Sequence, residues 1–223
     1  MKTFILSVFL LFTFYDSIIA QSNLKDEKIF GTEYFPLNKN LQYKFESNFG
    51  STTGKFKQSG KHFTINYLTE DGTLKYTFFK DSTGIYLTKT ETDIDVFLGI
   101  GSSSSITYDR PVLRIPFPLT IGQTWKWDGY EIEDDDRRKI KVEGKVLGEE
   151  TVNTSVGKFD CLKIRIKFTS EEGANNTITE WLAPNIGAVK IFAKLESTGI
   201  AGFFQDLLGL DEVYFNLTEV KGN

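Results

Sequence analysis

Apolar and polar residues alternate along most of this 223-residue chain. Leu41, Tyr43 and Phe45, for example, fall on one side of an extended segment, and the residues between them are polar. A period of two buries one face and exposes the other, which is typical of antiparallel sheets. The same pattern recurs at 63–67, 74–78, 140–146, 162–168, 189–195 and 213–217. The sequence therefore predicts an all-β protein with about ten or eleven strands.

Short acidic segments separate these runs and are typical of hairpin connections. They lie at Glu70–Gly72, Asp81–Gly84, Asp134–Asp136 and Glu171–Gly173. Within Trp125–Ile132 the apolar phase slips at Gly129, which predicts a β-bulge at that residue.

Two apolar segments interrupt the strand pattern. Ser197–Leu210 has apolar residues at helical spacing, Phe203 and Phe204 among them, and a serine at its start that suits a helix cap. We expect one short amphipathic helix there, between the last two strands. Val96–Gly101 is an apolar loop, which is unusual because connecting segments normally face water.

Two parts of the chain repeat a motif. Phe35–Leu37 and Phe117–Leu119 both read Phe-Pro-Leu, and each precedes an aromatic-Lys-aromatic strand at the same spacing. The motif indicates either pseudo-repeats at 34–110 and 116–220 or a chance recurrence in a chain rich in Phe and Lys. In both cases we expect a single β domain over 21–223.

The first twenty residues have the composition of a secretory signal peptide. Lys2 gives the positive start, Phe4–Phe14 the apolar core, and Ala20 a small residue at the predicted cleavage point. The apolar core is too short to span a bilayer as a helix. We therefore expect 1–20 to be removed and the mature domain to be periplasmic or secreted, with no transmembrane segment. The residue directly after the predicted cleavage point is Gln21 and not Cys, so no lipobox is predicted.

The composition narrows the classes of function. A net charge of −4 without a basic block argues against nucleic-acid binding. A single cysteine, Cys161, forms no internal disulfide, and together with the one histidine, His62, it is too few ligands for zinc. Aromatic residues make up 14% of the chain and favour half-buried sheet surfaces. We predict no cofactor and no metal.

Few side chains have the setting of a catalytic group. His62 shares a strand face with polar residues, and no nucleophile motif of the triad enzymes is present. Glu131–Asp136 is acidic but lacks calcium-loop spacing, so it is typical of a charged hairpin tip. Glu180, beside Trp181, falls in phase with apolar neighbours and is expected to point inward, but a glycosidase needs a second carboxylate near it. We predict that the protein is not an enzyme, with a hydrolase as the minor alternative.

Three motifs resemble those of the TapB-like family of exported bacterial domains. Val152–Ile164 has the pattern V-x-T-x-x-G-x-F-x-C-x-x-I, Thr179–Lys190 contains W-x-A-P-x-x-G-x-V-K, and Phe117–Trp127 contains FPL-x-x-G-x-x-W. The resemblance covers Phe117–Leu195 well and Tyr34–Lys89 more loosely. It implies a curved antiparallel half-barrel similar to lipoprotein-carrier folds. It implies no activity and no catalytic residues.

The pattern and the resemblance together predict a strongly curved antiparallel sheet or open barrel. Its concave face is apolar and has to be filled by a helix, a plug or a ligand. We predict a non-enzymatic envelope protein that binds a lipid or another apolar ligand in that concavity. The residues expected to line it are Tyr43, Phe45, Trp125, Trp127, Trp181, Phe203 and Phe204.

Two other interpretations remain open for these aromatic residues. They also fit an ordinary hydrophobic core, because most large aromatic side chains are buried for packing alone. The protein could also be a structural module that docks onto an envelope protein through the apolar segments at Val96–Gly101 and Ser197–Leu210.

Overall fold

The computed structural model describes residues 28–37, 40–48, 50–70, 72–96, 100–196 and 211–222. Within these residues the chain forms β-strands and one short 3-10 turn, η1 (Thr32–Tyr34). The strands are β1 (Ile29–Phe30), β2 (Leu41–Ser47), β3 (Gly50–Ser59), β4 (His62–Leu68), β5 (Gly72–Lys80), β6 (Gly84–Val96), β7 (Ile100–Pro116), β8 (Leu119–Thr120), β9 (Thr124–Glu133), β10 (Asp136–Thr154), β11 (Gly157–Ser170), β12 (Asn175–Ala183), β13 (Gly187–Lys194) and β14 (Glu212–Gly222). The prediction of an all-β fold is confirmed.

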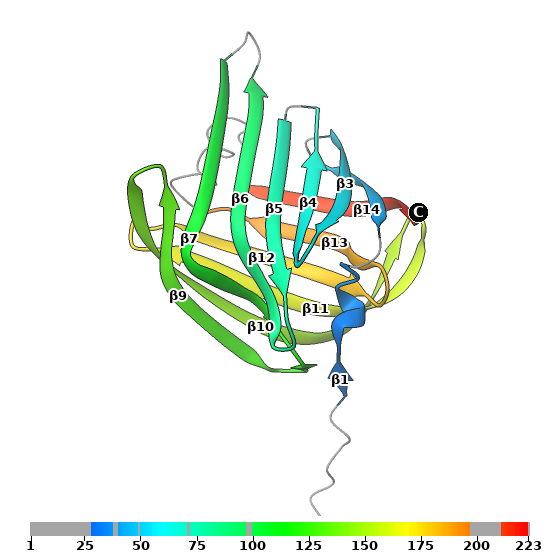
Figure 1. Cartoon of the computed structure of the whole chain (residues 1–223). Helices are drawn as coiled ribbons and strands as arrows, with labels where there is room; N and C mark the ends of the chain where they lie inside the picture. Colours follow the sequence, from blue (N-terminus) through cyan, green and yellow to red (C-terminus); the bar gives the residue numbers. More distant parts are fainter. Residues whose placement is uncertain are drawn as a thin grey trace, which may run out of the picture.

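Twelve of these strands form one closed antiparallel barrel. Strands β2 to β7 follow one another as a six-stranded meander, and β9 to β14 form a second one. Pairing of β14 with β2 and of β7 with β9 joins the two meanders. Figure 1 shows β4 to β7 in front, crossing over β10 to β13 behind them. The barrel is therefore flattened into two layers whose strands run in different directions.

The prediction of an open or half-barrel is wrong, because the barrel is closed. Each meander taken alone would leave two edge strands with unpaired backbone groups, and closure removes these edges. The period-two pattern shows which face of a strand is buried, but the same pattern fits an open sheet and a closed one. The small sheet of β1 and β8 lies beside the barrel strands and pairs Phe30 with Leu119.

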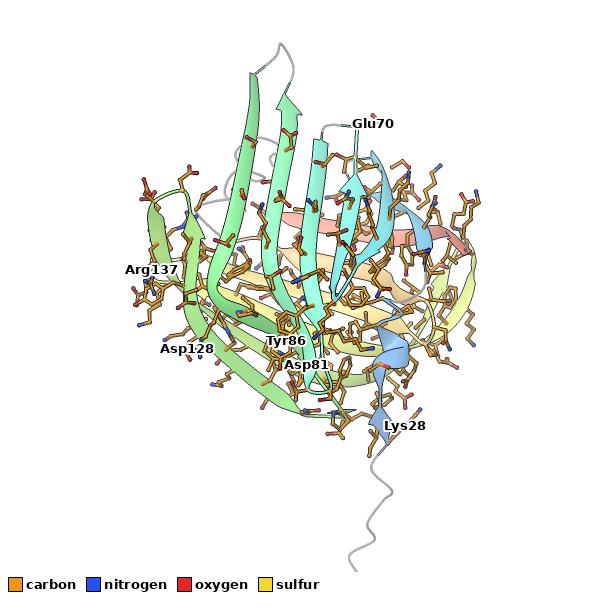
Figure 2. All side chains as sticks on the ribbon, viewed as in Figure 1. Lys28, Glu70, Asp81, Tyr86, Asp128 and Arg137 are labelled. Atoms are coloured by element: carbon orange, nitrogen blue, oxygen red, sulfur yellow. The ribbon has the colours of Figure 1, made fainter. Side chains whose placement is uncertain are left out.

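The predicted hairpin connections are confirmed where the structure describes them. Asp81 begins the turn between β5 and β6, which is visible beside Tyr86 in Figure 2. Its carboxylate oxygen Oδ1 accepts hydrogen bonds from the Thr83 amide at 2.7 Å and the Gly84 amide at 3.1 Å. The Thr83 hydroxyl also donates to Oδ1, at 2.7 Å, and this bond, followed by the two amide bonds, holds the pKa of Asp81 below its usual value. A short side chain that satisfies local backbone donors is what fixes such turns.

The predicted bulge at Gly129 is wrong. Strand β9 pairs with β10 in unbroken register from Thr124 to Glu133. Trp125, Trp127, Gly129 and Glu131 lie on the same face of the strand. The residues on this face change from apolar to polar, but the alternation between the two faces is not interrupted. The Trp127 ring covers Gly129, because a Cβ on Gly129 would lie 2.5 Å from that ring.

The hydrophobic core consists of two clusters of buried residues. The larger one contains the fully buried Val142, Ile164 and Ile166 of β10 and β11 together with residues from the opposite layer. The smaller one includes Tyr43 and Phe45 of β2 and extends across the seam between β2 and β14. Both clusters bury the alternating apolar residues predicted from the sequence.

Several predictions fall on residues outside the described ranges. The proposed signal peptide at 1–20 and the predicted helix at Ser197–Leu210 both lie there. The side chains of the apolar segment Val96–Gly101 are likewise outside the description. Among the residues that are described, no helix has the length and apolar character needed to cross a membrane.

A glycine in β10 allows close packing of the barrel wall. A Cβ on Gly144 would lie 2.0 Å from the indole ring of Trp125, its partner in β9. We expect Gly144→Ala to lower the free energy of unfolding by about 1–3 kcal/mol, because the rigid ring has to move. Urea denaturation measures this change.

The matched control is Gly222→Ala, where the nearest atom to a new Cβ is 3.6 Å away. This substitution should change stability by less than about 0.5 kcal/mol. Equal effects of the two substitutions would contradict the packing argument.

Candidate ligand-binding site

The barrel interior contains an apolar cavity of about 310 Å³. Its wall is built by inward-facing residues of both layers. On β13, for instance, Ile191 and Ala193 face the cavity, and on β14 Val213 and Phe215 do so. These are the residues of the period-two pattern, so alternation along the strands forms the wall.

A second, smaller cavity of about 90 Å³ lies on the side of η1 and β2. Tyr34 and Leu37 from the chain before β2 contribute to it, as do Tyr43 and Phe45 of that strand. Five described residues line both cavities: Ile65, Tyr67, Phe78, Arg114 and Glu180. The two cavities are therefore neighbouring lobes that share one part of the wall.

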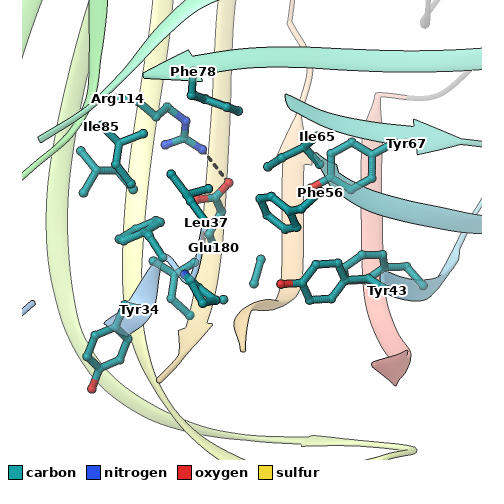
Figure 3. A pocket seen from close by; sticks show the side chains of 17 residues that line it. Tyr34, Leu37, Tyr43, Phe56, Ile65, Tyr67, Phe78, Ile85, Arg114 and Glu180 are labelled. Atoms are coloured by element: carbon teal, nitrogen blue, oxygen red, sulfur yellow. Dashed lines mark hydrogen bonds and ion pairs between the residues drawn. The ribbon is translucent and has the colours of Figure 1, made fainter. Parts of the chain in front are cut away.

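The shared wall contains a partly enclosed ion pair between the two layers. The Nη2 atom of Arg114 in β7 donates to Oε1 of Glu180 in β12 at 2.5 Å. The side chains of Arg114 and Glu180 are only 12% and 14% exposed. Figure 3 shows the pair among apolar side chains, with Phe78 and Ile85 near Arg114. No other Asp, Glu, Lys or Arg lines either cavity over the described residues.

Strand register explains why both side chains point inward. Glu180 lies between Ile164 of β11 and Ile191 of β13, on the apolar face of its sheet. Arg114 sits at a register shift, because Ile85 faces Ile115 while Tyr86 faces Leu113. A bulge of this kind turns a side chain from its regular direction. The bulge therefore supplies a cation opposite the inward carboxylate of Glu180.

The pair uses only part of its hydrogen-bonding capacity. A guanidinium group has several N–H donors and a carboxylate can accept several bonds. Among the described residues the Nη1 atom of Arg114 is buried and has no hydrogen-bond partner. A buried donor without a partner costs free energy of about 1–3 kcal/mol. The site thus has unused polar capacity within apolar walls.

Buried tyrosine side chains also line the two cavities. Burial raises the pKa of Tyr67 well above its ordinary value, and the negative charge of Glu180 adds to this effect. Burial also raises the pKa of Tyr76, to about 12, although the positive charge of Arg114 opposes the shift. The hydroxyl group of Tyr43 donates to the Ile186 carbonyl at 2.6 Å. At neutral pH these tyrosines are uncharged.

The structure brings together only some of the residues predicted to bind a ligand. Tyr43 and Phe45 line the smaller cavity. Trp125 and Trp127 are buried in the larger core cluster and line neither cavity. Trp181 pairs across the sheet with Lys163 and Lys190 and packs against both, with 4.7 Å from each Nζ to its ring.

Trp181 therefore shares a face with these lysines, opposite to that of Glu180, and it is buried in the same smaller core cluster as Tyr43 and Phe45. The two remaining candidates, Phe203 and Phe204, lie outside the described residues. The prediction that Glu180 points inward is confirmed, whereas sequence reasoning missed Arg114. Apolar residues occupy both phases around it, at Val112, Leu113 and Ile115, so alternation assigns Arg114 to neither face.

Other candidate groups line neither of the two apolar cavities. His62 is exposed on β4. In the acidic run, Glu131 and Glu133 pair with Arg138, at 3.1 Å and 2.6 Å. Across the part of the chain that the structure describes, no cluster of His, Cys, Asp and Glu is suited to a metal ion. Glu180 is the only carboxylate among the described residues that line the two cavities.

Comparisons with known proteins give partial matches. The DUF3108-like family profile matches residues 131–192, which is less than half of the chain. The TapB-like family suggested by the motifs is not confirmed. No curated protein matches the chain.

Two solved structures match this chain weakly. A presumptive lipoprotein from Parabacteroides distasonis ATCC 8503 is 14% identical, with a TM-score of 0.41 over 84% of this chain and 98% of that one. The hypothetical lipoprotein YmcC from Escherichia coli (K12) is 14% identical, with a TM-score of 0.42 over 81% of this chain and 84% of that one. At these scores the likeness does not extend to function.

The buried ion pair predicts an asymmetry between single and double substitutions. Arg114→Met leaves the Glu180 carboxylate enclosed without its partner, which should cost about 3–5 kcal/mol of unfolding free energy. Replacing both residues, as Arg114→Met with Glu180→Leu, should recover most of this loss, because no buried charge remains. Urea denaturation of the single and double variants measures both values.

The exposed pair of Lys126 and Glu143 is the control, since its side chains are 77% and 52% exposed. Lys126→Met should cost less than about 1 kcal/mol. A similarly small loss for Arg114→Met would show that water screens the inner pair as well.

Cys161 should be unreactive in the folded protein. Its side chain is buried in the smaller core cluster, and burial raises the pKa of the thiol to about 12. Since the thiolate is the reactive form, we expect a disulfide reagent to label Cys161 at neutral pH only when the chain unfolds. Rapid labelling without denaturant would contradict this placement.

Proposed function

We propose that this protein is an exported, non-enzymatic binding protein that holds an apolar small molecule inside its barrel. The observation that carries the proposal is the cavity of about 310 Å³ between the two layers. Ligand pockets are typically cavities of about 300–1,000 Å³ with mostly apolar walls and few polar groups. The interior wall has this composition, with mostly aliphatic and aromatic side chains, the hydroxyl groups of Thr90 and Tyr108, and a single ion pair.

Packing energetics supports the same conclusion. Protein interiors are normally close-packed, and an apolar void costs stability in proportion to its volume. An apolar ligand that occupies it restores the lost contacts and stabilises the folded state by mass action. Export rests on the predicted signal peptide at 1–20.

The alternative of a protein-docking module stays a prediction. It depends on the side chains of the apolar segments at Val96–Gly101 and Ser197–Leu210, which lie outside the described residues. The cavity, in contrast, is lined by described residues from both meanders.

Filling the larger cavity should abolish ligand binding. Ala193 lines this cavity, so Ala193→Phe places a ring in it. We expect the affinity for the uncharged dye N-phenyl-1-naphthylamine, measured by its fluorescence, to fall at least about tenfold. A dye concentration near a hundred times the dissociation constant should stabilise the parent protein by about 2.7 kcal/mol and the variant far less.

The matched control is Lys194→Phe, which adds the same ring to the next residue of β13, an exposed position that lines neither cavity. Its dye affinity should stay within about twofold of the parent value. Native mass spectrometry after organic extraction would identify a co-purified ligand. Absence of dye binding to the parent protein after extraction, together with no co-purified molecule, would refute the proposal.

A further inference from the structure

We propose that the Arg114–Glu180 pair binds the polar group of the apolar ligand, and that this group is uncharged, such as a hydroxyl. This inference rests on the proposed function and names the chemical class of the ligand. The ligand is then an amphiphile with an apolar body in the larger cavity and one neutral hydrogen-bonding group at the pair.

The position of the pair supports a direct contact. Arg114 and Glu180 line both cavities, so the small exposed fraction of each side chain faces the interior space. A molecule long enough to extend from the larger cavity into the smaller one must pass them. Figure 3 shows the pair beside Leu37 and Ile65, which gives the rest of this passage an apolar wall.

The chemistry of the pair suits a group that both donates and accepts. Within the described chain the guanidinium group of Arg114 makes one hydrogen bond, to Glu180, and its Nη1 atom has no partner. A hydroxyl oxygen can accept from the guanidinium group while its hydrogen is donated to the carboxylate. Such bonds involve a charged partner and are stronger than those between neutral groups.

Charge balance excludes an anionic group as the preferred one. The positive charge of Arg114 is already compensated by Glu180 at 2.5 Å. A ligand carboxylate would add a third charge, without a counterion, in a space where no other Asp, Glu, Lys or Arg of the described chain lies. Enclosing an uncompensated charge costs several kcal/mol. A neutral polar group avoids this cost and still uses the free hydrogen-bonding capacity.

Stability alone does not account for the pair. Replacing a buried ion pair by apolar residues of similar volume is often neutral or stabilising, so an apolar wall would serve the fold at least as well. A purely structural role is therefore the second outcome that the experiment has to distinguish.

The experiment measures displacement of N-phenyl-1-naphthylamine by three ligands with the same chain length: 1-octanol, octanoate and octane. At about pH 8 the octanoate is fully ionised. For the parent protein we expect 1-octanol to bind at least about tenfold more tightly than octanoate. Tighter binding of octanoate would overturn the inference.

Glu180→Gln provides the decisive variant, because it leaves the charge of Arg114 without a counterion. The preference should then reverse, and octanoate should bind more tightly than 1-octanol. An unchanged preference in this variant would show that the ligand does not reach the pair. Far-ultraviolet circular dichroism and the urea midpoint check that the variant is folded under the assay conditions.

The double variant Arg114→Met with Glu180→Leu tests the pair without leaving a buried charge. The affinity for 1-octanol should fall at least about tenfold, whereas octane and the dye should change by less than about twofold. The control variant Lys126→Gln with Glu143→Gln removes an exposed ion pair and should leave all affinities unchanged. Equal 1-octanol affinity in the parent and the double variant would assign the pair a purely structural role.

Failure of this inference differs from failure of the proposed function. If the dye and octane bind but the pair has no influence on ligand preference, the barrel is a binding protein with a different polar contact or none. If no apolar probe binds to the extracted parent protein, the binding function itself is wrong.

Discussion

Each β-meander depends on the other for the backbone partners of its outer strands. Strand β2 finds its second partner in β14, and β7 is joined to β9. The contact between β7 and β9 is short, because backbone pairing covers only Ile106–Tyr108 against Glu131–Glu133. An unpaired edge exposes backbone donors and acceptors, and closure satisfies them within one chain. The cavity and its ion pair exist only because this closure brings both layers together.

Side chains continue the short seam where the backbone pairing ends. Asp109 of β7 accepts a hydrogen bond from the Tyr130 amide at 3.0 Å. It also pairs with Arg137 at 3.5 Å, and Arg110 lies 5.5 Å from the Trp127 ring centroid. In Figure 2, Asp128 and Arg137 lie on the outer side of this seam. Fewer backbone pairs therefore join the meanders at this seam than at the pairing of β14 with β2.

The interior of the barrel contains both unfilled space and a pair of charged side chains. A barrel of this many strands encloses more space than its side chains fill, and flattening into two layers reduces the space without removing it. Among the described residues that line the remaining cavity, Arg114 and Glu180 are the only charged ones, and their pair joins the front layer to the back layer. A pair of opposite charges in an apolar wall costs desolvation but keeps the interior electrically neutral. An apolar cavity with a neutral ion pair in its wall is the arrangement that fits the proposed ligand, an apolar molecule with one uncharged polar group.

The sequence by itself determined the local structure, because alternation, turn residues and burial depend on neighbours along the chain. It correctly predicted the all-β fold, the hairpins at Asp81 and Asp134, and an inward Glu180 in phase with Ile178 and Leu182, but it predicted about ten or eleven strands where the described residues form fourteen. Barrel closure, the position of Arg114 and the burial of Trp181 on the face opposite to Glu180 were decided only by tertiary structure. Closure depends on pairing between strands far apart in the chain. Arg114 turns inward at a bulge, and the alternation pattern does not reveal this bulge because the residues around Arg114 are apolar on both faces. A single period-two pattern contains neither kind of information, since it records the face of each residue and not the partner opposite it.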